Sequence, residues 1–253
     1  MNLISLAVAL ALSLIPYTQA QQGATVAEQY LLQMVNEHRA QQGLAPLAWD
    51  AALARAAHAH AVLIMQNAAP ALHQYPGEPD LKSRTVSAGA HFSIVSENVA
   101  GDFPSAQELD RGWMNSPVHR ANILDPRLNA IGIAVALNHG KLYAVEDFAH
   151  TVAVLNPTEV EQQASDILRK QGIRPASATD ARQQARKTCL QPNYTAPDAT
   201  SVLQWDGPDL NELPTTLLKQ LPDARSHTVA VGACPSERRG EGFTTHHLVV
   251  VVY

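Results

Sequence analysis

The chain has 253 residues, of which 46% are hydrophobic and 16% are charged, a composition that is typical of one large buried core or two modest ones. Its formal net charge of −5 and its pI near 6.1 leave no excess of basic residues. Because nucleic-acid binding needs a basic surface, the composition argues against a nucleic-acid partner.

The first residues have the pattern of a secretory signal peptide. Residues 3–15 form an apolar run, and the small-residue ending Thr18-Gln19-Ala20 follows it. A run of this length is short for a bilayer span. We therefore expect a signal peptide over residues 1–20, export to a periplasm or to the outside, and no transmembrane span after its removal.

Two amphipathic helices follow. Thr25 and Glu28 form a capping box that begins a helix over residues 26–41. Asp50 caps a second helix, whose apolar stripe contains His60. This position predicts that His60 is a hydrogen-bonded core residue, and a short helix is expected over residues 81–88.

The next helical segment is interrupted at a Ser-Pro pair. Ser105 and Glu108 begin a helix that runs toward Ser116. Ser116 then fits the N-cap of a new helix with Pro117 at its first position. His119 falls in the first turn, where the helix dipole favours the neutral imidazole that binds metals.

A β-hairpin is predicted next. Residues 131–137 and 142–149 read as strands joined by a turn at residues 138–141. Alternation along the second strand places Glu146 and Asp147 on opposite faces. Helices outside an antiparallel sheet indicate a layered α+β domain.

A boundary is expected near residue 152. Thr158 and Glu161 suggest a capping box for a helix that ends at Gly172, and a polar helix is expected over residues 178–187. A Pro-rich stretch covers residues 191–208, and strands are predicted at 228–233 and 248–253. The last strand is apolar on both faces, which indicates a covered position in its sheet. No internal repeat is apparent.

Cys189 and Cys234 are the two cysteines of the chain. In an exported protein such a pair is most simply a disulfide, and the alternative is two buried thiols that pack as small hydrophobes.

Four stretches of the first half together resemble a known family. They are Asn36-Glu37-His38-Arg39, Gly43-Leu44-Ala45-Pro46-Leu47-Ala48-Trp49-Asp50, Ser96-Glu97-Asn98-Val99-Ala100 and Trp113-Met114-Asn115-Ser116-Pro117-Val118-His119-Arg120-Ala121-Asn122-Ile123-Leu124. In this order they resemble a bacterial member of the CAP superfamily, the SCP-like extracellular proteins. The resemblance spans residues 26–150 and implies a three-layer α-β-α sandwich, and residues 152–253 would be a smaller C-terminal α/β extension of no recognised family.

The resemblance also implies a cleft lined by His73, Glu97 and His119. Ser116 occupies the position at which animal relatives carry a second glutamate. Glu146 occupies a late-strand position at which relatives often carry glutamine. It would either add an acidic group to the cleft or be a solvated strand residue.

The cleft residues allow two chemistries. Zinc accepts imidazole nitrogen and carboxylate oxygen, so His73 and His119 are candidate metal ligands, with Glu97 as a third. The alternative is a hydrogen-bonded polar pocket without metal. A Ser116–His119 nucleophilic pair and a Glu97–Glu146 carboxylate pair are weaker readings, because no third residue orients His119 and spacing does not give the carboxylate separation.

Two functions follow from the cleft. The first is an exported binding or interaction module for a lipid, another small ligand or a component of the cell envelope. The second is a metal-assisted hydrolase in which Glu97 is the general base. The chain contains neither His-Glu-x-x-His nor Gly-x-Ser-x-Gly, so the binding module is preferred and no catalytic residue is assigned.

Overall fold

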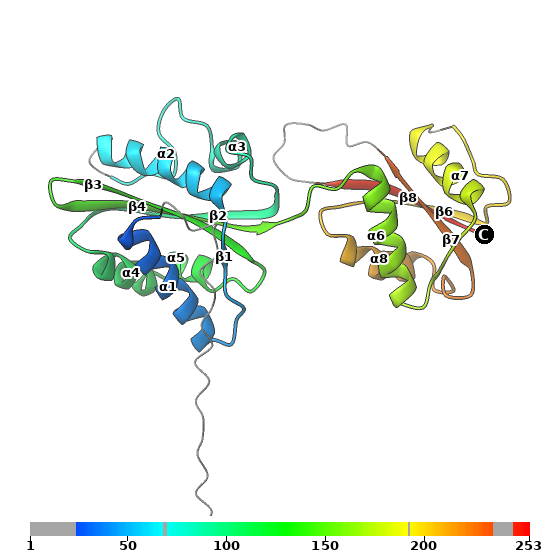
Figure 1. Ribbon diagram of the computed structural model, residues 1–253, viewed down its shortest axis with the longest axis horizontal. Coiled ribbons are helices and arrows are strands. Elements are labelled where there is room, and N and C mark those ends of the chain that lie inside the picture. The colour runs from blue at the N-terminus through cyan, green and yellow to red at the C-terminus, as the bar shows by residue number, and fades with distance from the viewer. Residues whose placement is uncertain (1–23, 68–69, 192, 235–244) are drawn as a thin grey trace, which may run out of the picture.

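Figure 1 shows the computed structural model of the chain, which describes residues 24–67, 70–191, 193–234 and 245–253. The predicted signal peptide lies outside these residues. Two four-stranded sheets stand side by side, each with helices on both faces, and residues 152–156 link the two halves. The chain is thus a mixed α and β protein, and its first half is the expected α-β-α sandwich.

The first sheet has the strand order β1-β3-β4-β2, with β1 parallel to β3 and the other neighbours antiparallel. Its strands are β1 (Ala48–Trp49), β2 (Phe92–Phe103), β3 (Ala130–Asn138) and β4 (Lys141–Thr151). Its helices are α1 (Val26–Gln41), α2 (Ala51–Asn67), α3 (Leu81–Ser87), α4 (Ala106–Asn115) and α5 (Pro117–Ile123).

The helices begin where the capping residues predict. The capping box of Thr25 and Glu28 is present in both directions. The Asp50 carboxylate accepts the backbone N–H groups of Ala52 and Leu53 at 2.8 and 2.9 Å. These side chains satisfy N–H groups that the first turn of a helix leaves unpaired.

The two faces of the first sheet have separate apolar cores. Leu31, Trp113 and Phe148 belong to the core under α1, α4 and α5, whereas Ala57, Ala61 and Val145 belong to the core under α2. Adjacent residues of β4 therefore contact different layers, as the predicted alternation requires. This alternation determines on which face of the sheet each buried carboxylate lies.

The second sheet has the order β5-β7-β8-β6. Its strands are β5 (Arg174–Pro175), β6 (Ser201–Gly207), β7 (Thr228–Cys234) and β8 (His246–Val252). Its helices are α6 (Pro157–Lys170), α7 (Thr179–Leu190), the 3-10 turn η2 (Leu210–Glu212) and α8 (Leu213–Gln220). The strand β8 lies between β7 and β6, which confirms the covered position predicted from its apolar faces.

One expectation for this half was wrong, and one strand was not predicted. The N-cap of α6 is Asn156, which forms the capping box with Glu159, so Thr158 is already inside the helix. Pro157 follows Asn156 at the first helical position, where a missing N–H is harmless. The Pro-rich stretch at 191–208 also contains the strand β6, whose apolar Leu203 and Trp205 alternate with polar residues.

Cys189 and Cys234 form a disulfide, with 5.5 Å between their Cα atoms and a sequence separation of 45. The bond joins the last turn of α7 to the end of β7. It therefore ties the helix to the sheet that it covers.

Replacing both cysteines with serine should lower the free energy of unfolding by roughly 3 to 4 kcal/mol, because a cross-link of this loop length restricts the unfolded chain. Urea unfolding of the oxidised wild type and the double variant measures the difference. Equal midpoints and slopes for the two proteins would contradict the stabilising role.

No helix within the described ranges combines the length and the apolar character that a bilayer span needs.

Candidate functional site

The fold brings His73, Glu97 and His119 to one region of the first half. Glu97 lies within β2, and the loop between α2 and α3 brings Nδ1 of His73 to 2.8 Å from the Glu97 Oε1 atom. Helix α5, which carries His119, is attached to the same strand. Asn122 donates to the Glu97 carbonyl at 3.1 Å, and Asn98 donates to the His119 carbonyl at 3.2 Å.

Glu97 is buried and has a partner on each carboxylate oxygen. Oε1 contacts His73, and Oε2 accepts a charge-assisted hydrogen bond from the guanidinium of Arg84 in α3. Arg84 also donates to the His73 carbonyl at 3.1 Å. Glu97 therefore holds the His73 ring in place, and its own charge is balanced by Arg84.

A second buried histidine secures the loop that carries His73. The His60 side chain is fully buried, its Nδ1 atom lies 2.7 Å from Glu78 and its Nε2 atom lies 2.9 Å from the Leu72 carbonyl. The expectation of a hydrogen-bonded core histidine is confirmed. Glu78 was not anticipated, because it lies in a Pro- and Gly-containing loop with no periodic pattern.

Asp147 is a further member of this cluster that the sequence did not single out. It is opposite Glu97 in the register of β2 and β4, it is fully buried, and neither carboxylate oxygen has a hydrogen-bond partner. Burial and the nearby Glu97 charge raise the pKa of Asp147 well above its usual range. Asp147 consequently favours its neutral, protonated form beside Glu97, which has Arg84 and His73 as partners.

The pKa values of the two candidate histidines are shifted in opposite directions. The hydrogen bond to Glu97 raises the pKa of His73, although burial opposes it, whereas burial and the nearby His73 lower the pKa of His119. The lowered pKa of His119 agrees with the neutral imidazole that was expected from the helix dipole, but the main cause of the lowering is burial. The site thus pairs an imidazole that protonates readily with one that stays neutral.

We predict that NMR titration of the imidazole signals will show His73 protonating at a higher pH than His119. Because the pKa of His73 is raised in the folded state, the His73–Glu97 contact stabilises the fold while His73 is protonated. This stabilisation is lost as the pH rises through the folded-state pKa. The exposed His58 on α2 provides an internal reference. A reversed order of the two midpoints would rule out the arrangement.

Ser116 and Glu146 lie outside this cluster. Ser116 occupies the N-cap of α5, but its side chain makes no capping hydrogen bond, contrary to expectation. Glu146 lies on the face of the sheet opposite Glu97, is fully buried and accepts from Asn98 at 3.1 Å, so it is not a solvated strand residue. Burial raises the pKa of Glu146 to about 8. The sheet separates Glu97 from Glu146, which removes the geometric basis for a carboxylate pair acting on one bond.

The donor set fits a metal ion only in part. Among the residues that the structure describes, no group of three His, Cys, Asp or Glu side chains is placed to hold an ion. Both oxygens of Glu97 are already engaged, whereas Nδ1 of His73 points to Glu97 and leaves Nε2 for a ligand. An ion at this site would therefore be held by His73 and His119, with Glu97 supporting the His73 ring.

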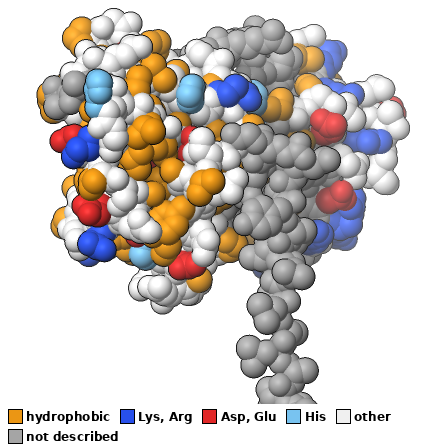
Figure 2. Space-filling view, turned by 60° about the vertical axis from the view of Figure 1, so that its left-hand side comes forward, with side chains coloured by type: hydrophobic (Ala, Val, Ile, Leu, Met, Phe, Trp, Pro, Cys, Tyr) orange, Lys and Arg blue, Asp and Glu red, His pale blue; other side chains and the backbone are white. Residues whose placement is uncertain are grey.

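Apolar side chains flank both histidines. Leu72 is 40% exposed and Val118 is 73% exposed, each directly beside its histidine in sequence. Figure 2 shows hydrophobic side chains gathered over this half of the molecule, with histidines near the edge of the patch. The surroundings of the histidines thus combine hydrogen-bonding groups with exposed apolar surface.

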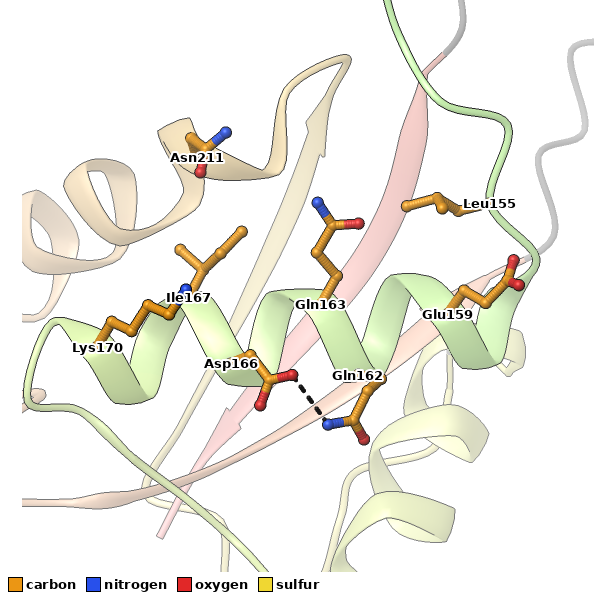
Figure 3. A pocket seen from close by; sticks show the side chains of 8 residues that line it. All are labelled: Leu155, Glu159, Gln162, Gln163, Asp166, Ile167, Lys170 and Asn211. Carbon is orange, nitrogen blue, oxygen red and sulfur yellow. Dashed lines mark hydrogen bonds between the residues drawn. The ribbon is translucent and has the colours of Figure 1, made fainter.

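A separate open groove of about 560 Å³ lies on α6 in the second half. Figure 3 shows the side chains that line it, which include the polar Gln163, Lys170 and Asn211 and the apolar Leu155 and Ile167, with Gln162 donating to Asp166 at 3.1 Å. None of the predicted site residues lines it.

Comparisons with known proteins agree with the first half of the fold. The model of the cysteine-rich secretory protein family (CAP) matches residues 32–155. The uncharacterized protein YkwD of Bacillus subtilis is 31% identical over 116 residues, which cover 46% of this chain and 45% of YkwD. The matched region thus spans less than half the length of that relative.

Two solved structures are also similar. An extracellular protein with an SCP domain from Bacillus anthracis is 25% identical, with a TM-score of 0.45, and the match covers 49% of this chain and 40% of that one. The structure of Na-ASP-1 is 9% identical, with a TM-score of 0.45, and the match covers 91% of this chain and 90% of that one.

Proposed function

Residues 32–155 of the chain belong to the cysteine-rich secretory protein (CAP) family, whose members are extracellular, and on that premise we propose that the protein is an exported binding module. Its ligand is a small molecule with a hydrogen-bonding head group and an apolar body, such as a lipid or a component of the cell envelope. The cleft that binds it is formed by His73, Glu97 and His119.

The observation that carries this proposal is the His73–Glu97–Arg84 arrangement beside exposed apolar surface. Buried polar contacts fix the His73 ring, while 62% of its side chain remains exposed. A head group could accept a hydrogen bond from His73 and donate one to the neutral His119. Leu72 and Val118 would contact the apolar body.

A fatty acid that carries an environment-sensitive fluorophore tests the proposal with the full-length exported protein. We expect saturable binding by the wild type and at least a tenfold weaker affinity for the His73→Ala and His119→Ala variants, because each removes one head-group contact worth about 1.4 kcal/mol or more.

The His58→Ala variant is the matched control, since His58 is an exposed histidine of α2. It should bind like the wild type. Equal affinity in all four proteins, or no binding to the wild type together with no lipid recovered from it, would refute the proposed ligand class.

The second candidate is a metal-assisted hydrolase, favoured by the free Nε2 atom of His73 beside His119. A bound zinc ion would supply Lewis-acid chemistry and an activated water. Glu97 is poorly suited as the general base, since Arg84 and His73 engage both of its oxygens. Zinc titration by calorimetry distinguishes the two: stoichiometric binding that both histidine variants abolish would favour the metal site over the binding module.

A further inference from the structure

The two sheets have the same topology. In order across the sheet they read β1-β3-β4-β2 and β5-β7-β8-β6. In each, the first pair is parallel and the next two pairs are antiparallel. Along the chain, each half also runs helix, strand, helix, strand, helix and β-hairpin, with α3 as an addition in the first half (Figure 1).

The register at the short first strand is also the same. The second residue of β1, Trp49, pairs with Ile131, and the next N–H, of Asp50, donates to the Ile131 carbonyl at 2.9 Å. The second residue of β5, Pro175, pairs with Val229, and the next N–H, of Ala176, donates to the Val229 carbonyl at 2.7 Å. Ile131 and Val229 are therefore equivalent positions.

The helices that open the two halves end in the same way. Gln42-Gly43-Leu44 follows α1 and Gln171-Gly172-Ile173 follows α6, with positive φ at each glycine. The N–H of the residue after the glycine donates back to the helix at 3.0 Å in both cases, to Arg39 and to Leu168.

In each half, a glutamate of the opening helix accepts a hydrogen bond from a backbone N–H of the β-hairpin. Glu28 of α1 accepts the N–H of Val135 at 3.0 Å, and Glu161 of α6 accepts the N–H of Ala233 at 3.0 Å. Val135 and Ala233 each lie four residues after the equivalent positions Ile131 and Val229.

A strand glycine contacts the backbone of the covering helix in each half. A Cβ atom at Gly132 would lie 2.1 Å from the backbone nitrogen of Ala54 in α2, and one at Gly232 would lie 2.2 Å from the backbone carbon of Ala185 in α7. The two glycines differ by two residues from strict equivalence, which keeps them on the same face of the strand.

We infer that residues 157–252 are a second copy of the fold of residues 26–151, in which the cleft has been lost. The equivalence replaces each buried polar group of the first sheet by an apolar residue. Val202 and Val251 take the places of Glu97 and Asp147, and Leu203 and Val250 take the places of Asn98 and Glu146.

The segment that carries His73 is also longer than the corresponding segment of the second half. Residues 68–91 separate α2 from β2, whereas residues 191–200 separate α7 from β6. Tyr194, Ala196 and Ala199 of this shorter segment pack on the apolar face that contains Val249 and Val251. The second copy thus keeps the strand order and register of the first but lacks the polar cluster around Glu97. The full chain is therefore expected to hold one cleft.

Amide hydrogen exchange of the full chain, followed by NMR, tests the equivalence of the halves. The Glu28→Ala variant should raise the exchange rate of the Val135 amide at least tenfold and leave that of Ala233 unchanged, and Glu161→Ala should do the reverse. The exposed Glu37→Ala serves as a control. Unchanged Ala233 exchange in Glu161→Ala, or inter-strand nuclear Overhauser effects that pair β5 with a strand other than β7, would overturn the inference.

The number of fatty acid molecules bound per chain tests the loss of the second cleft, and this experiment rests on the proposed function. The fluorescent fatty acid should bind one per chain, and none should remain bound to the His73→Ala, His119→Ala double variant. A second equivalent that survives in the double variant would overturn the single-cleft inference. Absence of any binding would overturn the proposed function, while the exchange experiment would still decide whether the halves are equivalent.

Discussion

The Gly132→Ala variant is expected to lose about 3 kcal/mol or more of folding free energy, because an added methyl group overpacks the contact between β3 and α2. The Cβ atom would lie 2.1 and 2.2 Å from backbone atoms of Ala54 and Leu53. Backbone cannot rotate away as a side chain can, so the helix must move. Since α2 also carries His60, we expect the loop around His73 to loosen as well.

Differential scanning calorimetry of the full chain measures this effect, and the expected fall in Tm is roughly 6 to 12 °C for a chain of this size. Gly101→Ala is the control, because its Cβ atom would meet the ring of Tyr143 at 3.1 Å and a ring can shift. Similar Tm values for the Gly132→Ala protein and the wild type would show that α2 does not lie directly on β3.

The Glu146→Gln variant is expected to be more stable than the wild type at neutral and alkaline pH. Burial raises the pKa of Glu146 to about 8 from a usual 4.5, so the folded chain binds a proton that the unfolded chain has released. The stability contribution of Glu146 is therefore complete below about pH 4.5 and is lost progressively as the pH rises to about 8. The loss is about 1.4 kcal/mol per pH unit, several kcal/mol over the window.

Urea unfolding of both proteins between pH 5 and pH 8 gives the measurement, because glutamine keeps the hydrogen bond from Asn98 without titrating. The raised pKa of Asp147 contributes a fall of the same sign in both proteins, so the difference between them isolates Glu146. Glu37→Gln, on the exposed face of α1, should show no such gain. A stability difference between Glu146→Gln and the wild type that is constant with pH would mean that Glu146 is not buried as a neutral acid.

Much of the first half could be predicted from the sequence, because its signals are local. Thr25, Glu28 and Asp50 mark helix starts by side-chain chemistry that acts within one turn. The alternation at Glu146 and Asp147 correctly assigned them to opposite faces.

The polar cluster around Glu97 could be predicted only in part. The pairing of His73 with Glu97 agrees with the family resemblance, but Arg84, Glu78 and Asp147 reach the cluster through tertiary contacts. Their sequence surroundings contain no periodic pattern that points to Glu97. The surroundings of the buried Glu146 likewise come from distant parts of the chain, since Asn98 of β2 donates to it and the charge of Asp110 in α4 acts on it.

The similarity of the two halves could not be recognised from the sequence, for a physical reason. A sheet covered by helices on both faces needs apolar residues on both faces of its strands and a close contact with a helix, and many sequences meet those needs. The positions that distinguish the first half, Glu97 and Asp147, are apolar in the second. Only strand order and register made the correspondence between Ile131 and Val229 visible.

The most direct test of the proposed cleft is NMR observation of the imidazole signals of His73 and His119 while the full chain is titrated with the fluorescent fatty acid. Both signals should shift along one binding curve, while His58 and the buried His60 keep their chemical shifts. Binding of the fatty acid that moves neither signal would place its site elsewhere and rule out the cleft.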